Sequence, residues 1–266
     1  MEEHKDFPKF WTAVLILALL VCLQIIIAAF AYDLGFSYEL GDPKSSVITV
    51  LSCGIALSLL MGYKKIGYQA LFNPTSNSLK SLVVVLIVPI TFTVGGGVFW
   101  ITDITNLMLV YFPASQEEYL LLARMLSGGV ATIVSVCLIA PFIEEMLFRG
   151  LILRSFLQNY SSISAIALSS LLFALFHFTV SQLPVAFILG CFLGWLYLRT
   201  KSLWPSILAH FLYNSLVIIL QSLEHSSIES VEFTPGFHSF GVILLALASS
   251  TAGLLALYFI LRPRSV

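Results

Sequence analysis

Residues 140–150, with the sequence APFIEEMLFRG, place two adjacent carboxylates and one arginine inside a run that is otherwise apolar from Gly129 to Leu157. A charged side chain at membrane depth costs about 2.5–3.5 kcal/mol on insertion scales, so such residues tend to pair, to face water and to serve a function. Because helical residues four apart share a face, we expect Glu145 to pair with Arg149. Glu144 then lacks a local counter-ion and is the candidate for chemistry.

The composition around this stretch is that of a polytopic membrane protein. Of the 266 residues, 59% are hydrophobic and 10% are charged, whereas soluble domains carry about 25% charged residues. The net charge of −1 gives no indication of nucleic-acid binding. The four cysteines lie in apolar runs without metal-ligand spacing, which favours reduced packing residues.

The N-terminal apolar run begins at Phe10 and is longer than the hydrophobic region of a signal peptide. Residues 29–31, AFA, resemble a cleavage site, but Glu2, Glu3 and Asp6 are not typical of a basic leader. We therefore expect a retained first transmembrane helix.

Apolar runs predict an all-α fold with about eight membrane-spanning helices. If the N-terminus lies inside, every one of the 13 lysines and arginines except Lys44 and Arg124 falls on the cytoplasmic side, as the positive-inside rule requires. Both termini are then cytoplasmic. The expected spans are Phe10–Tyr32, Ser46–Tyr63, Ser81–Ile101, Gly129–Leu157, Ser162–Phe178, Leu183–Leu198, Leu203–Gln221 and Phe240–Leu261.

The chain is expected to form one membrane domain in three parts. Residues 1–127 contain the N-terminal helices and an interfacial segment, for which we predict an amphipathic or re-entrant structure over Thr102–Leu126. Residues 128–221 form the core that carries the candidate site, and residues 222–266 contain an outer loop and the last helix. The protein is predicted to be integral to a membrane, which is the plasma membrane if the cell is a prokaryote.

Ionisable residues inside the predicted spans are few. Glu144 and Glu145 are the only two acids there, and His177 and His210 are the only two histidines clearly within spans. Asn214 follows His210 by four residues, so an imidazole and an amide share one helical face and can both donate to one anionic oxygen. A carboxylate, a histidine and such a donor face are the groups needed to activate water and stabilise an oxyanion.

At three motifs the sequence resembles the CAAX prenyl endopeptidase family, also called CPBP (CAAX proteases and bacteriocin-processing enzymes). The family pattern Glu-Glu-x-x-x-Arg, then Phe-x-x-x-His, then His-x-x-x-Asn occurs here in that order. The three motifs begin at Glu144, Phe173 and His210. The resemblance covers residues 128–220 and implies an eight-span intramembrane protease that acts on a prenylated or membrane-associated substrate.

The resemblance also implies roles for the site residues. Glu144 and His177 activate the attacking water, His210 and Asn214 form the oxyanion hole, and Glu145 with Arg149 maintain the shape of the site. No cofactor is then required. The alternative is a metalloprotease in which Glu144, His177 and His210 bind zinc with a water molecule, although the sequence has no His-Glu-x-x-His motif.

Other interpretations remain open at this point. Glu144 can be a buried protonated acid, and each histidine can be a polar contact between helices. A non-catalytic immunity or scaffold protein with the same fold is possible, because a motif does not prove turnover. A proton-coupled transporter also places Glu, His and Arg in spans, but the two matching halves with broken helices that are typical of carriers are not seen in the sequence.

Overall fold

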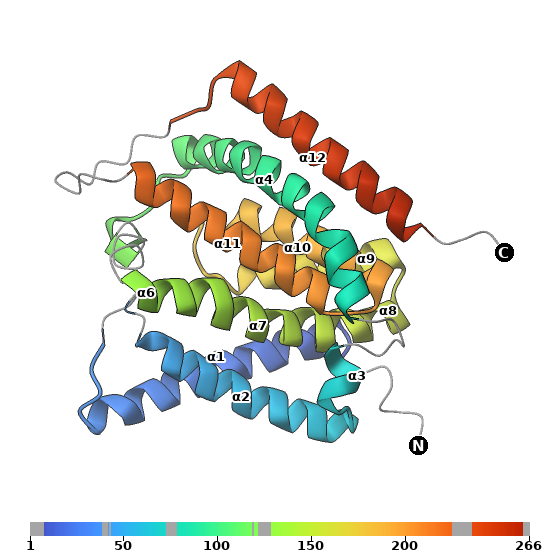
Figure 1. Ribbon diagram of the computed structural model, residues 1–266. Helices are drawn as coiled ribbons and strands as arrows, with labels where there is room; N and C mark the ends of the chain where they lie inside the picture. Colours follow the sequence, from blue (N-terminus) through green and yellow to red (C-terminus); the bar gives the residue numbers. More distant parts are fainter. Residues whose placement is uncertain are drawn as a thin grey trace.

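The computed structural model describes residues 8–38, 42, 44–72, 79–118, 120–121, 129–224 and 236–262, and the regular structure in these ranges is entirely helical (Figure 1). A long helical segment, Gly129–Asn159, runs through the middle of the bundle. On one side of it pack α1 (Phe10–Asp33) and α2 (Ser45–Lys64), followed by the short α3 (Tyr68–Phe72). The remaining helices cover its other side: α9 (Ser162–Leu175), α10 (Leu183–Thr200), α11 (Trp204–Glu224), α4 (Leu79–Tyr111) and, outermost, α12 (Phe240–Leu261).

The central segment alternates between α-helical and π-helical geometry. It consists of α6 (Gly129–Thr132), η1 (Ile133–Ile139), α7 (Ala140–Glu145), η2 (Met146–Leu153) and α8 (Arg154–Asn159). Pro141 lies at the start of α7 and has no N–H to donate to the preceding turn. The two π-helical stretches flank the helical turn that carries both glutamates, and π-helical segments are frequent at functional sites.

The predicted all-α polytopic fold is confirmed, and two of its spans differ from the prediction. Within the described ranges, seven helices are long and apolar enough to cross a membrane. The predicted fifth span is instead α9, whose 14 residues extend for about 21 Å, less than the ~30 Å of a hydrocarbon core. The predicted end at Phe178 is wrong, because the helix ends at Leu175 and Phe178 adopts a φ of 57°. A short helix is tolerated here because α9 packs against η2, α8 and α10.

The third span is longer than predicted. We expected it to end at Ile101 and an interfacial segment to begin at Thr102, but α4 continues to Tyr111. The polar residues of this extension bind the segment before α12: Asp103 accepts from the backbone N–H and Nδ1 of His238, and Asn106 donates to the Gly236 carbonyl. The rest of the predicted interfacial segment includes residue 119 and residues 122–126, which lie outside the described residues.

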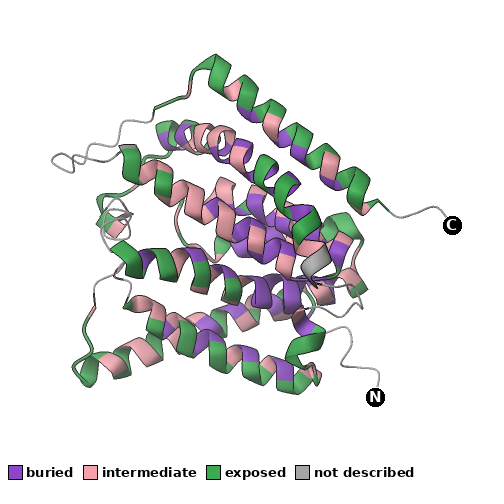
Figure 2. Ribbon diagram, viewed as in Figure 1, coloured by how far each residue is buried: buried purple, intermediate pink, exposed green. Residues whose placement is uncertain are grey.

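Burial follows the same arrangement. Buried residues gather on the central helices, whereas the outward faces of α1 and α12 are exposed (Figure 2). These exposed faces are apolar, as expected for helices that contact lipid. The start of α1 and the end of α12 lie at the same end of the bundle (Figure 1). That arrangement agrees with an even number of crossings, and the cytoplasmic orientation of this end stays a prediction.

Candidate active site

Glu145 and Arg149 form a buried ion pair, as predicted from their spacing. Nη1 of Arg149 lies 2.8 Å from Oε1 of Glu145, and the two side chains are 1% and 0% exposed. Nη2 of Arg149 donates to the Gly190 carbonyl at 3.2 Å, and the guanidinium carbon lies 4.5 Å from the centroid of the Phe173 ring. The pair is therefore held by α10 and α9 as well as by its own helix.

His210 is a third member of this network. Its Nδ1 lies 3.0 Å from Oε1 of Glu145, and its Nε2 lies 3.8 Å from Oε2 of Glu144. The imidazole therefore connects the two glutamates from α11. Helix spacing could not reveal this contact, because 65 residues separate Glu145 from His210.

Glu144 is the more accessible of the two glutamates. Its side chain is 24% exposed, whereas that of Glu145 is fully buried. Glu145 is thus buried in an ion pair, whereas the adjacent Glu144 is partly exposed and lies next to His210. The pairing of Glu145 with Arg149 follows the predicted spacing, and the catalytic role of Glu144 stays a prediction.

His177 lies in the turn after α9 rather than inside a span. Its Nδ1 is 2.8 Å from the Phe173 carbonyl, and its ring packs edge-on against Phe173 with 4.8 Å between centroids. No ion pair joins His177 to Glu144, although both residues are described. The structure therefore does not bring the predicted water-activating pair into direct contact.

Phe173 is the residue that connects the separate parts of the site. Its ring contacts Arg149, His177 and His210, the last of these edge-on with 5.8 Å between centroids. From the sequence Phe173 is known only as part of a motif, because helical spacing alone does not distinguish such an aromatic from a core residue. In the structure Phe173 is 1% exposed, and the guanidinium of Arg149 packs over its ring.

Asn214 binds the central helix through a carbonyl that Pro141 leaves free. In a π-helix each backbone N–H donates to the carbonyl five residues earlier, as Ala140 does to Ser135. The N–H that would donate to the Val136 carbonyl is therefore that of residue 141. Pro141 has no N–H, and Nδ2 of Asn214 donates to the Val136 carbonyl instead, at 2.8 Å. One amide hydrogen of Asn214 is used in this way, and the second stays available.

The turn that carries His177 is tied to a distant segment. Ser181 donates hydrogen bonds to Oε1 of Glu118 from both its backbone N–H and its hydroxyl group. These hydrogen bonds join residues that are 63 positions apart, and no local spacing in the sequence predicts them. Phe178, between His177 and Ser181, has a positive φ that bulky residues rarely adopt, so the turn needs such external support.

Within the described residues, no three His, Cys, Asp or Glu side chains are arranged so that they could hold a metal ion. The predicted alternative zinc ligands, Glu144, His177 and His210, therefore do not form a metal site in this conformation.

The segment that contains this site is similar to known proteins. Residues 126–216, which contain all three motifs, match the family model described as type II CAAX prenyl endopeptidase Rce1-like. This matched segment is about a third of the chain, and over it the chain is similar to the CAAX prenyl endopeptidases.

Two curated proteins are similar to parts of the chain. The protein named "Putative membrane peptidase YdiL" of Bacillus subtilis (strain 168) is 31% identical over 84 residues, which are 32% of this chain and 34% of the relative. The "Membrane-embedded CAAX protease MroQ" of Staphylococcus aureus (strain USA300) is 31% identical over 121 residues, which are 43% of this chain and 48% of the relative. The chain thus matches between a third and a half of the length of each. No solved structure gave a significant match.

Proposed function

We propose that this protein is an intramembrane endopeptidase of the CAAX protease family that hydrolyses a peptide bond in a prenylated or membrane-associated protein. The observation that carries the proposal is the position of Glu144: an open carboxylate 3.8 Å from a histidine that the buried Glu145–Arg149 pair holds in place. Membrane location supports a substrate that is itself associated with the bilayer.

Glu144 is the proposed general base. Its carboxylate is too far from Nε2 of His210 for a direct hydrogen bond, but one water molecule can lie about 2.8 Å from both atoms. Glu144 accepts a proton from this water, and the hydroxide attacks the scissile carbonyl. Glu144 then returns the proton to the departing amine.

His177 is the proposed partner in water activation. Because a carbonyl can only accept, Nδ1 of His177 carries the hydrogen that binds the Phe173 carbonyl. Nε2 of the neutral ring therefore has a free lone pair and can accept a hydrogen bond from the water.

His210 and Asn214 are the proposed oxyanion hole. Nδ1 of His210 donates to Glu145, so Nε2 donates to the oxyanion when the ring is doubly protonated. Asn214 contributes its second amide hydrogen. Donors that are held in place before the reaction stabilise the developing charge most effectively.

The experiment is cleavage of a prenylated CAAX peptide and of a casein-type substrate by the purified protein. Glu144→Gln is compared with wild type and with Glu145→Gln, each with and without a strong zinc chelator. We expect Glu144→Gln to be inactive and well folded, and we expect the chelator to have no effect on the wild type.

Two results would contradict the proposal. Activity that is lost with chelator and restored by zinc would make Glu144, His177 and His210 metal ligands. A wild-type protein that is well folded and cleaves neither substrate would instead favour the non-catalytic scaffold or immunity protein.

A further inference from the structure

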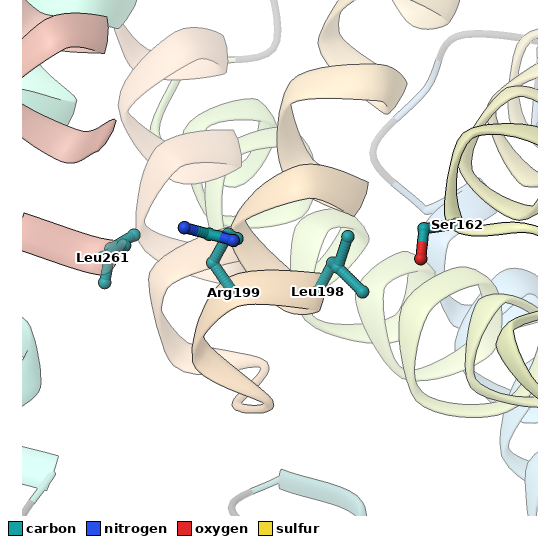
Figure 3. A pocket seen from close by; sticks show the side chains of 4 residues that line it. All are labelled: Ser162, Leu198, Arg199 and Leu261. Atoms are coloured by element: carbon teal, nitrogen blue, oxygen red, sulfur yellow. The ribbon is translucent and has the colours of Figure 1, made fainter. Parts of the chain in front are cut away.

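One end of the bundle has an open hollow that none of the site residues line. It has a volume of about 400 Å³ and lies between the first turn of α9 and the last turns of α10 and α12 (Figure 3). Its lining residues are Ser162, Leu198, Arg199 and Leu261. The Arg199 guanidinium points toward Leu261 on α12, and Leu198 lies between Arg199 and Ser162.

Arg199 has no partner within the described part of the chain. Its Nε is buried without a hydrogen-bond acceptor, and no ion pair joins its guanidinium to a described carboxylate. Arginine is always charged and has five donors in a planar fork. A buried donor without an acceptor is costly, so this group favours a ligand that supplies acceptor oxygens.

The charges around the hollow also favour an anion. Arg262 directly follows Leu261, and Lys201 follows Arg199 by two residues. Among the described carboxylates, Asp42 pairs with Lys44, Asp103 binds His238 and Glu118 binds Ser181. Glu144 and Glu145 belong to the active site. No described carboxylate forms an ion pair with Arg199.

The position of the hollow determines the kind of anion. It lies where two membrane-spanning helices, α10 and α12, end, which is the level of the lipid headgroups. Leu198 and Leu261 provide apolar walls beside the guanidinium, and the Ser162 hydroxyl lies at the positive end of the 14-residue helix α9. Basic pockets between membrane helices suit lipids with a phosphate headgroup.

We propose that this hollow binds the phosphate of an anionic phospholipid, with Arg199 as its main ligand and Leu198 and Leu261 against the upper part of the acyl chains. The site goes beyond the proposed protease activity, because none of its residues belongs to the catalytic set. It would hold the ends of α9, α10 and α12 together in a membrane that contains the lipid.

The test is native mass spectrometry of the full-length protein released from micelles that contain equal amounts of phosphatidylglycerol and phosphatidylcholine. We expect wild type to retain phosphatidylglycerol preferentially, and we expect Arg199→Gln to reduce this preference about fivefold, the effect of one basic residue near an anionic surface. Lys65→Gln is the matched control, because it removes one exposed charge at the end of α2, a helix that does not line the hollow. It should retain the wild-type preference.

A second variant and a competition with inorganic phosphate test the lipid site further. Leu261→Trp fills the hollow without changing charge and should also lower retention of phosphatidylglycerol. This variant tests the site even if Arg199→Gln does not fold. Inorganic phosphate at millimolar concentration should not displace the lipid; displacement by phosphate would identify a free-anion site and overturn the assignment to lipid. Equal retention by wild type, Arg199→Gln and Leu261→Trp would also overturn it.

Discussion

The carboxylate of Glu145 and the imidazole of His210 are in contact across 65 residues of sequence, with 3.0 Å between Oε1 and Nδ1. The same carboxylate oxygen accepts a hydrogen bond from Arg149 at 2.8 Å. This shared oxygen ties α7 to α11 and leaves Nε2 of His210 on the side of Glu144. The two adjacent glutamates are therefore expected to respond differently to the same substitution.

Glu144→Gln should lower kcat by about 10²- to 10⁴-fold, the usual contribution of a general base. Gln has the shape of Glu but cannot accept the proton. Because the Glu144 side chain is partly exposed and outside the buried ion pair, the thermal stability should stay near that of wild type. Substrate cleavage and a thermal melt in the same detergent measure both quantities, and substantial remaining activity would exclude Glu144 as the base.

Glu145→Gln should act mainly on stability. It leaves the buried Arg149 charge without its counter-ion, and breaking such a pair typically lowers the free energy of unfolding by about 3–5 kcal/mol. Denaturant titration with a helical circular-dichroism signal measures this loss. A Glu145→Gln protein as stable as Glu144→Gln would contradict the distinction between the two residues.

Gly190→Ala should destabilise the packing that holds Arg149. An added Cβ would lie 2.9 Å from Cβ and 3.1 Å from Oγ of Ser170, so α10 would have to move away from α9 and withdraw the carbonyl that Arg149 binds. We expect a loss of about 1–3 kcal/mol in the free energy of unfolding.

The matched control for Gly190 is Gly54→Ala in α2, where an added Cβ meets no atom within 4 Å. It should be neutral or stabilising, because alanine is the better helix former. A Ser170→Gly substitution removes the clash and should restore part of the Gly190→Ala loss. Failure of this rescue would show that the loss does not come from the α9–α10 contact.

Asn214→Ala should cost about 0.6–1.7 kcal/mol of stability, the range for hydrogen bonds between membrane helices. The cost should shrink in a Pro141→Ala background, because residue 141 then has an N–H for the Val136 carbonyl. Activity should stay low in both backgrounds if the second amide hydrogen of Asn214 serves the oxyanion. Equal stability costs in the two backgrounds would contradict the explanation through Pro141.

Glu118→Gln should loosen the turn that carries His177, because the amide binds the two donors of Ser181 less strongly than the carboxylate does. We expect faster hydrogen exchange over residues 176–182 and about tenfold lower kcat, a loss of about 1.4 kcal/mol in transition-state stabilisation. Glu117→Gln is the control, since Glu117 is an exposed neighbour. Equal exchange in the two variants would show that Glu118 does not hold the turn.

Local spacing was sufficient to predict several parts of the site. Glu145 and Arg149 pair because they are four residues apart on one helix, and that relation depends only on helical geometry. The polytopic all-α fold followed in the same way from long apolar runs. In both cases the interactions lie within one helix or between one helix and lipid.

The tertiary structure decided what lies between helices. The contact of His210 with Glu145, the support of Arg149 by Gly190 and Phe173, and the tie from Glu118 to Ser181 each join separate segments. The short length of α9 is also decided at this level, because α9 packs against neighbouring helices within the protein. The sequence by itself thus determined which residues are charged, apolar or four apart on a helix. Only the packing of the helices decided which nitrogen faces which carboxylate, because that depends on contacts across many residues of chain.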